Sequence, residues 1–299
     1  MELVKPIDIR TRYSSSNAAY LNPLWATGNS YSIGDKVDHL FNTYQAVQNI
    51  PASSPESELY DPLHWTDLGA NNKYAMFDNQ VSTQTTGTTQ LDITIRPQDA
   101  VNTVSLLNIV GSSAEITVYD TPGGSIIYHD VQSLQGDVVL DWYQYFFYDY
   151  NTQRTQTVWR DIPLYQTCEI NIKINSVGPV AVGYVVAGVS SNLGLTSYGL
   201  SAGIIDYSKK ETDPVYGTTT FLERAFKKRM SCNVYVHTPD LNRVSRTLAN
   251  NRATPSLWIG AVDPLYEETT VVFGFFREFN IEIPSPGYSL CSLDIEGLI

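Results

Sequence analysis

Apolar and polar residues alternate over several short stretches in the middle of the chain. These stretches are residues 91–95, 104–109, 115–119, 125–128, 137–140, 168–174 and 180–186. Alternation sends successive side chains to opposite faces of a strand, so half-buried strands are expected there. Turn signals separate them, notably Thr-Pro-Gly-Gly at 121–124 and Gly-Pro at 178–179. Regular short strands of this kind predict a β-sandwich over residues 71–190.

The order of these stretches resembles the galactose-binding-like jelly roll, in which a run such as 104–109 is followed by a strand such as 116–119. The resemblance implies two packed sheets whose end loops bind sugars or partners. It lies in the pattern alone, and no ligand residue is carried over from it.

In the last third of the chain, some apolar residues are spaced as in a helix and others as in a strand. Residues 217–230 are expected to form a short helix, because four apolar residues fall on one helical face: Phe221, Leu222, Ala225 and Phe226. A second helix is expected at 240–250, where Asp240 can cap the first turn. Strands are expected at 256–260, 270–276, 279–283 and 289–295. Residues 191–299 are therefore predicted to form an α+β domain with an antiparallel sheet.

The first 70 residues divide into two parts. Residues 1–20 are restricted by Pro6 and too polar at 14–17 to be buried, so they are expected to form an extended arm of the kind that lies on a neighbouring subunit. Residues 21–70 are expected to form a small β domain, in which Gly34-Asp35 is a hairpin-type turn signal. The segment 69–72 is typical of a linker and places a boundary there.

The small domain carries a regular set of aromatic residues. Trp25, Tyr31, Gly34-Asp35, Val37, Tyr44, Ala46 and Trp65 follow one another with a spacing that resembles the small chitin-binding type of carbohydrate-binding module. The resemblance implies that Trp25, Tyr31, Tyr44 and Trp65 bind glycan, because sugar C–H groups pack on aromatic faces. The alternative is that these rings build the core, since so small a domain has few other apolar residues.

Residues 141–150 form a dense aromatic run. Six of its rings are candidates for a subunit interface: Trp142, Tyr143, Tyr145, Phe146, Phe147 and Tyr148. If the run is a strand, one face cannot bury all of them. Three interpretations stay open: a strand covered on both faces by its own domain, a subunit interface, and glycan stacking. The enrichment of aromatic residues in interface cores supports the second.

Charge narrows the range of partners. The formal net charge of -12 argues against nucleic-acid binding, because an acidic surface repels phosphates. One basic cluster, at 209–210 and 224–229, is interrupted by acidic residues and is interpreted as a solvated face or subunit contact rather than an anion site. The N-terminus lacks the features of a signal peptide, and no stretch approaches the roughly 20 apolar residues of a membrane span.

No catalytic constellation is identifiable, so the chain is expected not to be an enzyme and to need no cofactor. Motifs of serine hydrolases, zinc proteases and phosphate- or dinucleotide-binding loops are absent from the sequence. The four histidines have no suitably spaced partner. Cys168, Cys232 and Cys291 lack the spacing of a zinc site or a disulfide framework, so no metal is expected and buried free thiols are predicted.

Several short segments resemble tail-region proteins of tailed bacteriophages, namely 74–78, 81–89, 275–279 and 293–298. The resemblance implies a structural virion protein, assembled in the host bacterial cytoplasm as a homo-oligomeric ring, non-contractile tail sheath or fibre adaptor beside other tail proteins. The alternative is a receptor-binding protein that attaches the virion to host surface polysaccharide through residues 21–70. A lower alternative is a polysaccharide-degrading glycosidase, with carboxylates among Glu267, Glu268, Asp141 and Asp149.

Overall fold

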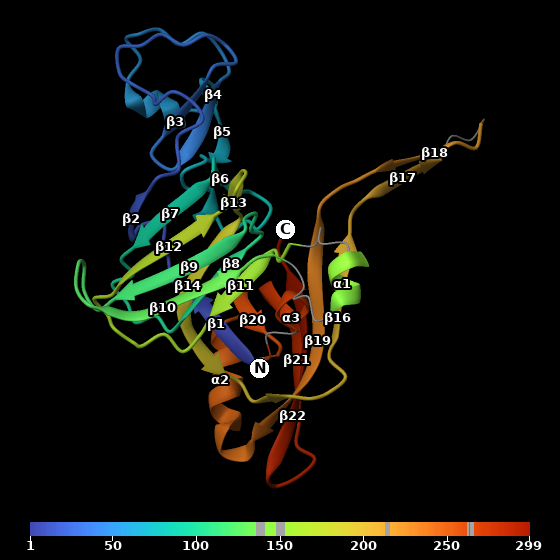
Figure 1. Ribbon diagram of the computed structural model, residues 1–299. Helices are drawn as coiled ribbons and strands as arrows, with labels where there is room; N and C mark the ends of the chain where they lie inside the picture. The colour runs from blue at the N-terminus through green and yellow to red at the C-terminus, as the bar shows by residue number, and fades with distance from the viewer. Residues whose placement is uncertain (136–140, 148–152, 213–215, 262, 264–265) are drawn as a thin grey trace.

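The computed structural model describes all residues except 136–140, 148–152, 213–215, 262 and 264–265, and it confirms a mainly β fold. Figure 1 shows two packed sheets, a small domain at one end and a two-stranded arm that projects from the body. The strand expected at 137–140 lies outside the described residues.

A five-stranded sheet is built from the alternating stretches. Its strands in spatial order are β10 (Ile126–Ser133), β9 (Ser113–Tyr119), β12 (Glu169–Asn175), β7 (Gln90–Ile95) and β2 (Tyr13–Ser16). In β12 the side chains of Ile170, Ile172 and Ile174 are fully buried, and the residues between them are half-buried. The strands predicted at 91–95, 115–119 and 168–174 are therefore confirmed.

A ten-stranded antiparallel sheet forms the rest of the body. Nine of its strands follow the order β11 (Gln156–Trp159), β8 (Thr103–Leu107), β14 (Tyr184–Asn192), β1 (Glu2–Pro6), β20 (Ser256–Ile259), β21 (Val271–Glu282), β22 (Tyr288–Gly297), β19 (Phe226–His237) and β15 (Leu195–Thr196). The tenth, β16 (Ser201–Asp206), also pairs with β19.

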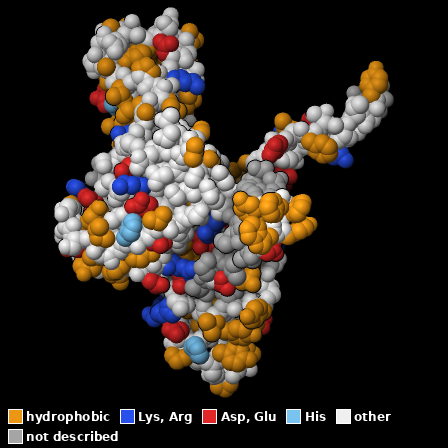
Figure 2. All heavy atoms as spheres, viewed as in Figure 1, with side chains coloured by type: hydrophobic (Ala, Val, Ile, Leu, Met, Phe, Trp, Pro, Cys, Tyr) orange, Lys and Arg blue, Asp and Glu red, His pale blue; other side chains and the backbone are white. Residues whose placement is uncertain are grey.

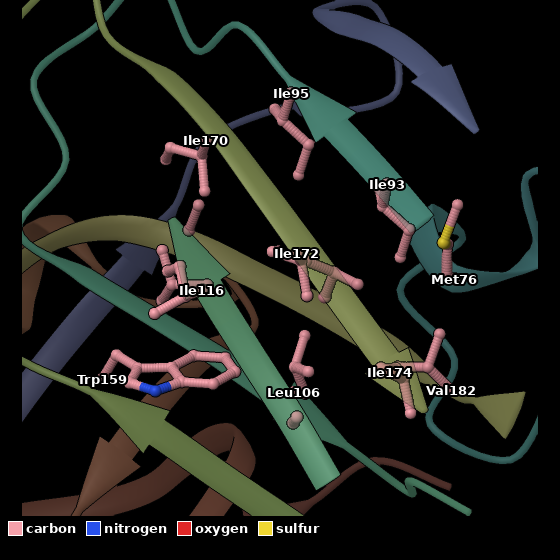
Figure 3. Packing of buried hydrophobic residues seen from close by; sticks show 14 of the residues in the cluster. Met76, Ile93, Ile95, Leu106, Ile116, Trp159, Ile170, Ile172, Ile174 and Val182 are labelled. Carbon is pink, nitrogen blue, oxygen red and sulfur yellow. The ribbon is translucent and has the colours of Figure 1, made fainter. Parts of the chain in front are cut away.

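The main core lies between the five-stranded sheet and one end of the ten-stranded sheet. Figure 3 shows Trp159 of β11 and Leu106 of β8 facing isoleucines of β7, β9 and β12. Each fully buried side chain of this size contributes about 1.5–3 kcal/mol of transfer free energy. This packing gives the predicted β-sandwich, but the second sheet continues past residue 190.

The N-terminal segment is extended, as expected, but it belongs to the sheets of its own chain. β1 pairs with β14 on one side and with β20 on the other, and Leu3 and Val4 are buried. Because β1 links β14 to β20, one sheet crosses the expected boundary at residues 190 and 191. The sequence-based picture of an arm on a neighbouring subunit is corrected: non-local strand pairing, invisible in the local polarity of residues 1–20, fixes β1, and β2 pairs with β7.

The C-terminal third contains one predicted helix and lacks the other. The helix expected at 240–250 is confirmed as α2 (Leu241–Asn250), which buries Val244 and Leu248. The helix expected at 217–230 is wrong, because this segment forms β18 (Thr219–Leu222) and the start of β19. Two strands predicted separately at 270–276 and 279–283 are one strand, β21, which carries an irregularity in register between Phe276 and Glu278.

The ten-stranded sheet curls until its two ends meet. Lys228 Nζ, from β19, donates hydrogen bonds of 2.8 Å to Gln156 Oε1 of β11 and to the carbonyl oxygen of Glu268. Gln156 Nε2 donates in turn to the carbonyl oxygen of Glu267. The short helix α3 (Glu267–Thr270) thus joins strands that are far apart in the order of the sheet. These side-chain hydrogen bonds connect β19 to β11, which are not paired as strands.

Residues 21–70 fold as a small three-stranded domain with its own core, as Figure 1 shows. Its elements are β3 (Lys36–His39), β4 (Asn42–Ala46), the 3-10 helix η1 (Glu56–Tyr60) and β5 (Trp65–Ala70). The expected linker at 69–72 is instead ordered. Asn72 is buried, donates to the carbonyl oxygen of Ala19 at 2.9 Å, and accepts from the backbone N–H of Thr86 at 2.9 Å. The shorter elements that complete the fold are η2 (Ala75–Phe77), β6 (Thr85–Gly87), β13 (Val180–Val182) and η3 (Thr238–Asp240).

The position of β1 predicts a clear effect of substitution. Leu3→Ala is expected to lower the free energy of unfolding by about 2–5 kcal/mol, because it opens a cavity in the core of the C-terminal half. Lys5→Ala, at an exposed position of the same strand, is the matched control and should change it by less than about 0.5 kcal/mol. Guanidinium unfolding followed by circular dichroism measures both. If the loss for Leu3→Ala appeared only at high protein concentration, β1 would be docking between chains.

Candidate functional site

The aromatic residues predicted to bind glycan form the centre of the small domain. Tyr44 and Trp65 are only 7% and 3% exposed, and they pack with Val37, Ile50 and Leu59. With so little of either ring exposed, neither can serve as an open platform for a sugar, so their expected role as platforms is corrected. The physical reason is that the small sheet of β3, β4 and β5 has its hydrophobic core on one face, and the large side chains of Tyr44 and Trp65 fill that core.

Trp25 and Tyr31 lie at the margin of the same core. Both are half-buried, and the Tyr31 ring meets the Trp65 ring edge-on with centroids 5.3 Å apart. The Tyr31 hydroxyl accepts a hydrogen bond of 2.9 Å from the backbone N–H of Ala26. All four predicted residues therefore belong to one cluster, and their arrangement matches the core-building alternative.

A hollow of about 250 Å³ opens beside this core. It is lined by Tyr44, Leu59, Tyr60, Pro62, Trp65, Thr66 and Asp67. Tyr60 is exposed and stands almost perpendicular to Tyr44, with centroids 6.1 Å apart. Burial, and then the nearby Asp67 carboxylate, raise the pKa of the Tyr44 hydroxyl. Sequence reasoning missed Tyr60, because the segment around it looked like a polar loop; η1 is what turns its ring to the surface.

The aromatic run contains a helix, α1 (Trp142–Phe147), rather than a strand. Ring pairs four residues apart explain this choice: Trp142 stacks on Phe146 with centroids 6.3 Å apart, and Tyr143 contacts Phe147 at 4.9 Å. Trp142, Tyr143, Tyr145, Phe146 and Phe147 are each between 59% and 79% exposed, and we call these five residues the aromatic helix cluster. Tyr148 lies outside the described residues. Figure 2 shows the cluster as an apolar patch on the surface.

The arm is formed by β17 (Lys209–Thr212) and β18 (Thr219–Leu222), which pair only with each other among the described strands. It continues the hairpin of β16 and β19 away from the body (Figure 1). Phe221 and Leu222 are 72% and 51% exposed. Two of the four apolar residues that predicted a helix, Phe221 and Leu222, therefore lie on a projecting ribbon without a core beneath it.

Among the described residues, the carboxylates considered for glycan cleavage lie in different settings. Glu267 is buried, 3.6 Å from Arg154, and burial raises the pKa of its carboxyl despite the opposing effect of Arg154 and Arg160. Glu268 accepts a hydrogen bond from Thr155 Oγ1. Both belong to the closure of the curled sheet. Asp141 is exposed beside α1, and Asp149 lies outside the described residues.

A cavity of about 430 Å³ lies next to this closure, between β8, β11, β19 and β21. Its walls are mostly apolar, with Leu107, Phe226, Phe273 and Leu298 among them. Lys228 contributes an ammonium group, and burial lowers the pKa of that amine. Gln156 Oε1 and the carbonyl oxygen of Glu268 accept hydrogen bonds from this amine, so Lys228 has a structural role in the closure.

Two histidines of the small domain form ion pairs at its surface rather than a metal site. His39 pairs with Glu56 at 2.9 Å and His64 with Asp61 at 2.9 Å, both at the surface of the small domain. The described residues contain no group of three or more His, Cys, Asp or Glu side chains placed to hold a metal ion. Every helix within the described part of the chain is too short or too polar to cross a membrane.

No family model matches this chain, and no match was found among curated proteins. Two features stand out, because each leaves large apolar side chains in water: the aromatic helix cluster and the arm.

The three cysteines are free and buried, as predicted. Cys232 and Cys291 lie on the neighbouring strands β19 and β22, offset by two residues in register. Burial raises the pKa of each of these thiols from an ordinary 9.0 to about 11, and it also raises the pKa of Cys168. With a pKa near 11, only about 0.1% of a thiol is ionised at pH 8, and the thiolate is the reactive form.

The native protein is therefore expected to react slowly with a thiol reagent at pH 8, and the unfolded protein to release all three thiols at once. Because the folded pKa exceeds the unfolded one, the unfolded chain loses these protons first, so stability should decline as the pH rises above about 9. Ellman's reagent with and without guanidinium measures the first effect, and chemical unfolding at pH 8 and pH 10 measures the second. Rapid reaction of Cys232 in the native protein would contradict this placement.

Proposed function

We propose that this chain is a structural protein of a bacteriophage tail that assembles with copies of itself into a ring, a non-contractile sheath or a fibre adaptor. The resemblance of its sequence to phage tail-region proteins supports the biological setting. The observation that carries the self-assembly is the aromatic helix cluster, five exposed rings within six consecutive residues.

The exposed area of this cluster is too large for an ordinary monomer surface. An aromatic side chain presents about 150–250 Å², so five rings at these exposures leave roughly 700 Å² open to water. The largest apolar patch of a typical monomer is about 300–600 Å². A stable interface buries about 800 Å² on each partner, so the cluster alone supplies most of one side of such a contact.

The aromatic helix cluster predicts a specific effect on assembly. Trp142→Ala combined with Phe146→Ala is expected to shift the purified protein from oligomers to a smaller species, because loss of central aromatic anchors costs about 2 kcal/mol or more each. Size-exclusion chromatography with light scattering measures the mass, and negative-stain imaging shows rings or tubes.

Leu63→Ala, at an exposed leucine of the small domain, is the matched control and should leave the mass unchanged. Both variants should keep the far-UV circular dichroism spectrum of the parent protein, since the substituted side chains are largely exposed. An unchanged oligomer in the double variant, or an unchanged infectivity of particles carrying it, would remove the assignment of this interface.

A second candidate function, attachment to host surface glycans, has one supporting observation, the hollow beside Tyr60. An exposed tyrosine ring next to the Asp67 carboxylate offers a stacking face and a hydrogen-bond acceptor, a combination that suits a sugar. A single shallow site binds weakly. Copies on an assembled particle would act together, because linked sites gain effective concentration.

The hollow predicts that Tyr60→Ala lowers binding of the full chain to bacterial polysaccharide by about tenfold or more, as expected for loss of a central aromatic contact. A bacterial glycan array probed with the oligomeric chain measures this. Tyr165→Ala, at another exposed tyrosine in the sandwich half, is the control. Silence of the parent protein across the array would remove the candidate, and equal loss in both variants would point away from the hollow.

A further inference from the structure

We infer that the arm of one copy packs on the aromatic helix cluster of a second copy. The inference rests on the proposed self-assembly and names the contact that produces it. Its starting point is that one chain carries two apolar features without a covering partner among the described residues, a ribbon that reaches outward and a helix that stays on the body.

The arm lacks support within its own chain. β17 and β18 form a two-stranded ribbon, and no other described strand pairs with either of them. Adjacent residues of a strand point to opposite faces, so Phe221 and Leu222 place an apolar side chain on each face of the ribbon. An isolated two-stranded hairpin is marginally stable in water. The arm therefore gains order when another surface covers it.

The chemistry of the arm fits an aromatic surface. The Lys210 ammonium group lies 6.0 Å from the centre of the Phe221 ring, and Lys209 pairs across the ribbon with Leu222. On the Leu222 face the Lys209 ammonium group is paired with the Glu211 carboxylate, and the Phe221 face combines an apolar side chain with an ammonium group. Aromatic faces attract both, and tryptophan is the strongest cation–π acceptor. The aromatic helix cluster offers Trp142 and four further rings.

Charge favours a second copy of this chain as the partner. The body is strongly acidic, since the whole chain carries a net charge of -12. Residues 207–225 carry three basic and three acidic residues, so the arm is neutral. Two acidic bodies repel each other, but a neutral arm approaches a neighbouring body without this cost. A long arm also keeps the two bodies apart.

The shape of the chain makes the contact intermolecular. In Figure 1 the ribbon of β17 and β18 runs outward from the body and away from α1. In this arrangement the arm of a chain leaves that chain's own aromatic helix cluster exposed. Contact between two different surfaces is heterologous, so each copy donates an arm to one neighbour and accepts an arm from another. Repetition closes a ring or extends a filament.

Mixed cysteine variants test the contact directly. Phe221→Cys and Phe146→Cys are prepared as separate proteins, mixed, allowed to exchange subunits, and oxidised. The native thiols are buried and do not compete. The expected product is a disulfide between the two variants, identified by mass spectrometry of the linked peptides. Phe221→Cys mixed with Val177→Cys, an exposed position on the turn between β12 and β13, is the control and should give at least tenfold less of the mixed disulfide.

A second pair of variants gives an independent measurement. Phe221→Asp combined with Leu222→Asp is expected to reduce the oligomer to a monomer in light scattering without changing the far-UV circular dichroism spectrum, because both side chains are exposed. Leu21→Asp combined with Leu63→Asp adds the same charge at two exposed leucines of the small domain and should leave the oligomer intact. Dissociation by both pairs would overturn the inference, since charge alone would then explain the effect.

The outcomes separate the inference from the proposed function. Oligomers that persist with cross-linking no higher than in the control overturn the arm contact and leave self-assembly standing. A parent protein that stays monomeric in light scattering at every concentration overturns both. Oligomers together with the specific 221–146 disulfide support both.

Discussion

The pairing of β1 with β14 and β20 is the constraint on which the rest of the structure depends. Without it, the sandwich half and the C-terminal half would be two sheets with free edges. With it, they form one sheet long enough to curl, and the closure through Lys228, Gln156 and α3 becomes possible. The first strand of the chain can therefore pair only after later parts of the chain have folded, because its two partner strands contain residues near 190 and 257.

The same constraint explains which parts of the fold could be predicted from the sequence. β7, β9 and β12 were predicted because alternation is a local property, and their faces differ sharply in polarity. β1 was misinterpreted because five residues carry too little pattern, and its burial comes from strands far along the chain. The domain boundary near residue 190 failed for the same reason. Local composition changes there, whereas hydrogen bonding between strands continues across it.

Two segments rich in apolar and aromatic residues show that the same spacing of apolar residues can occur in a strand or in a helix. Phe221, Leu222 and Phe226 fit a helical face in the sequence, but strand pairing with β17 and β16 places them in an extended ribbon. The run at 142–147 was considered as a strand, and ring pairs four residues apart stabilise it as a helix. In the small domain the important residues were predicted correctly, but the sugar-binding role given to them was not. With so few apolar residues available, Tyr44 and Trp65 form the core.

The distribution of apolar surface connects these observations to function. The core between the two sheets is built largely of isoleucine and valine side chains, whereas the five rings of the aromatic helix cluster and the pair Phe221 and Leu222 on the arm are exposed. In the proposed assembly these two exposed apolar features cover each other between copies of the chain, which would remove both from water.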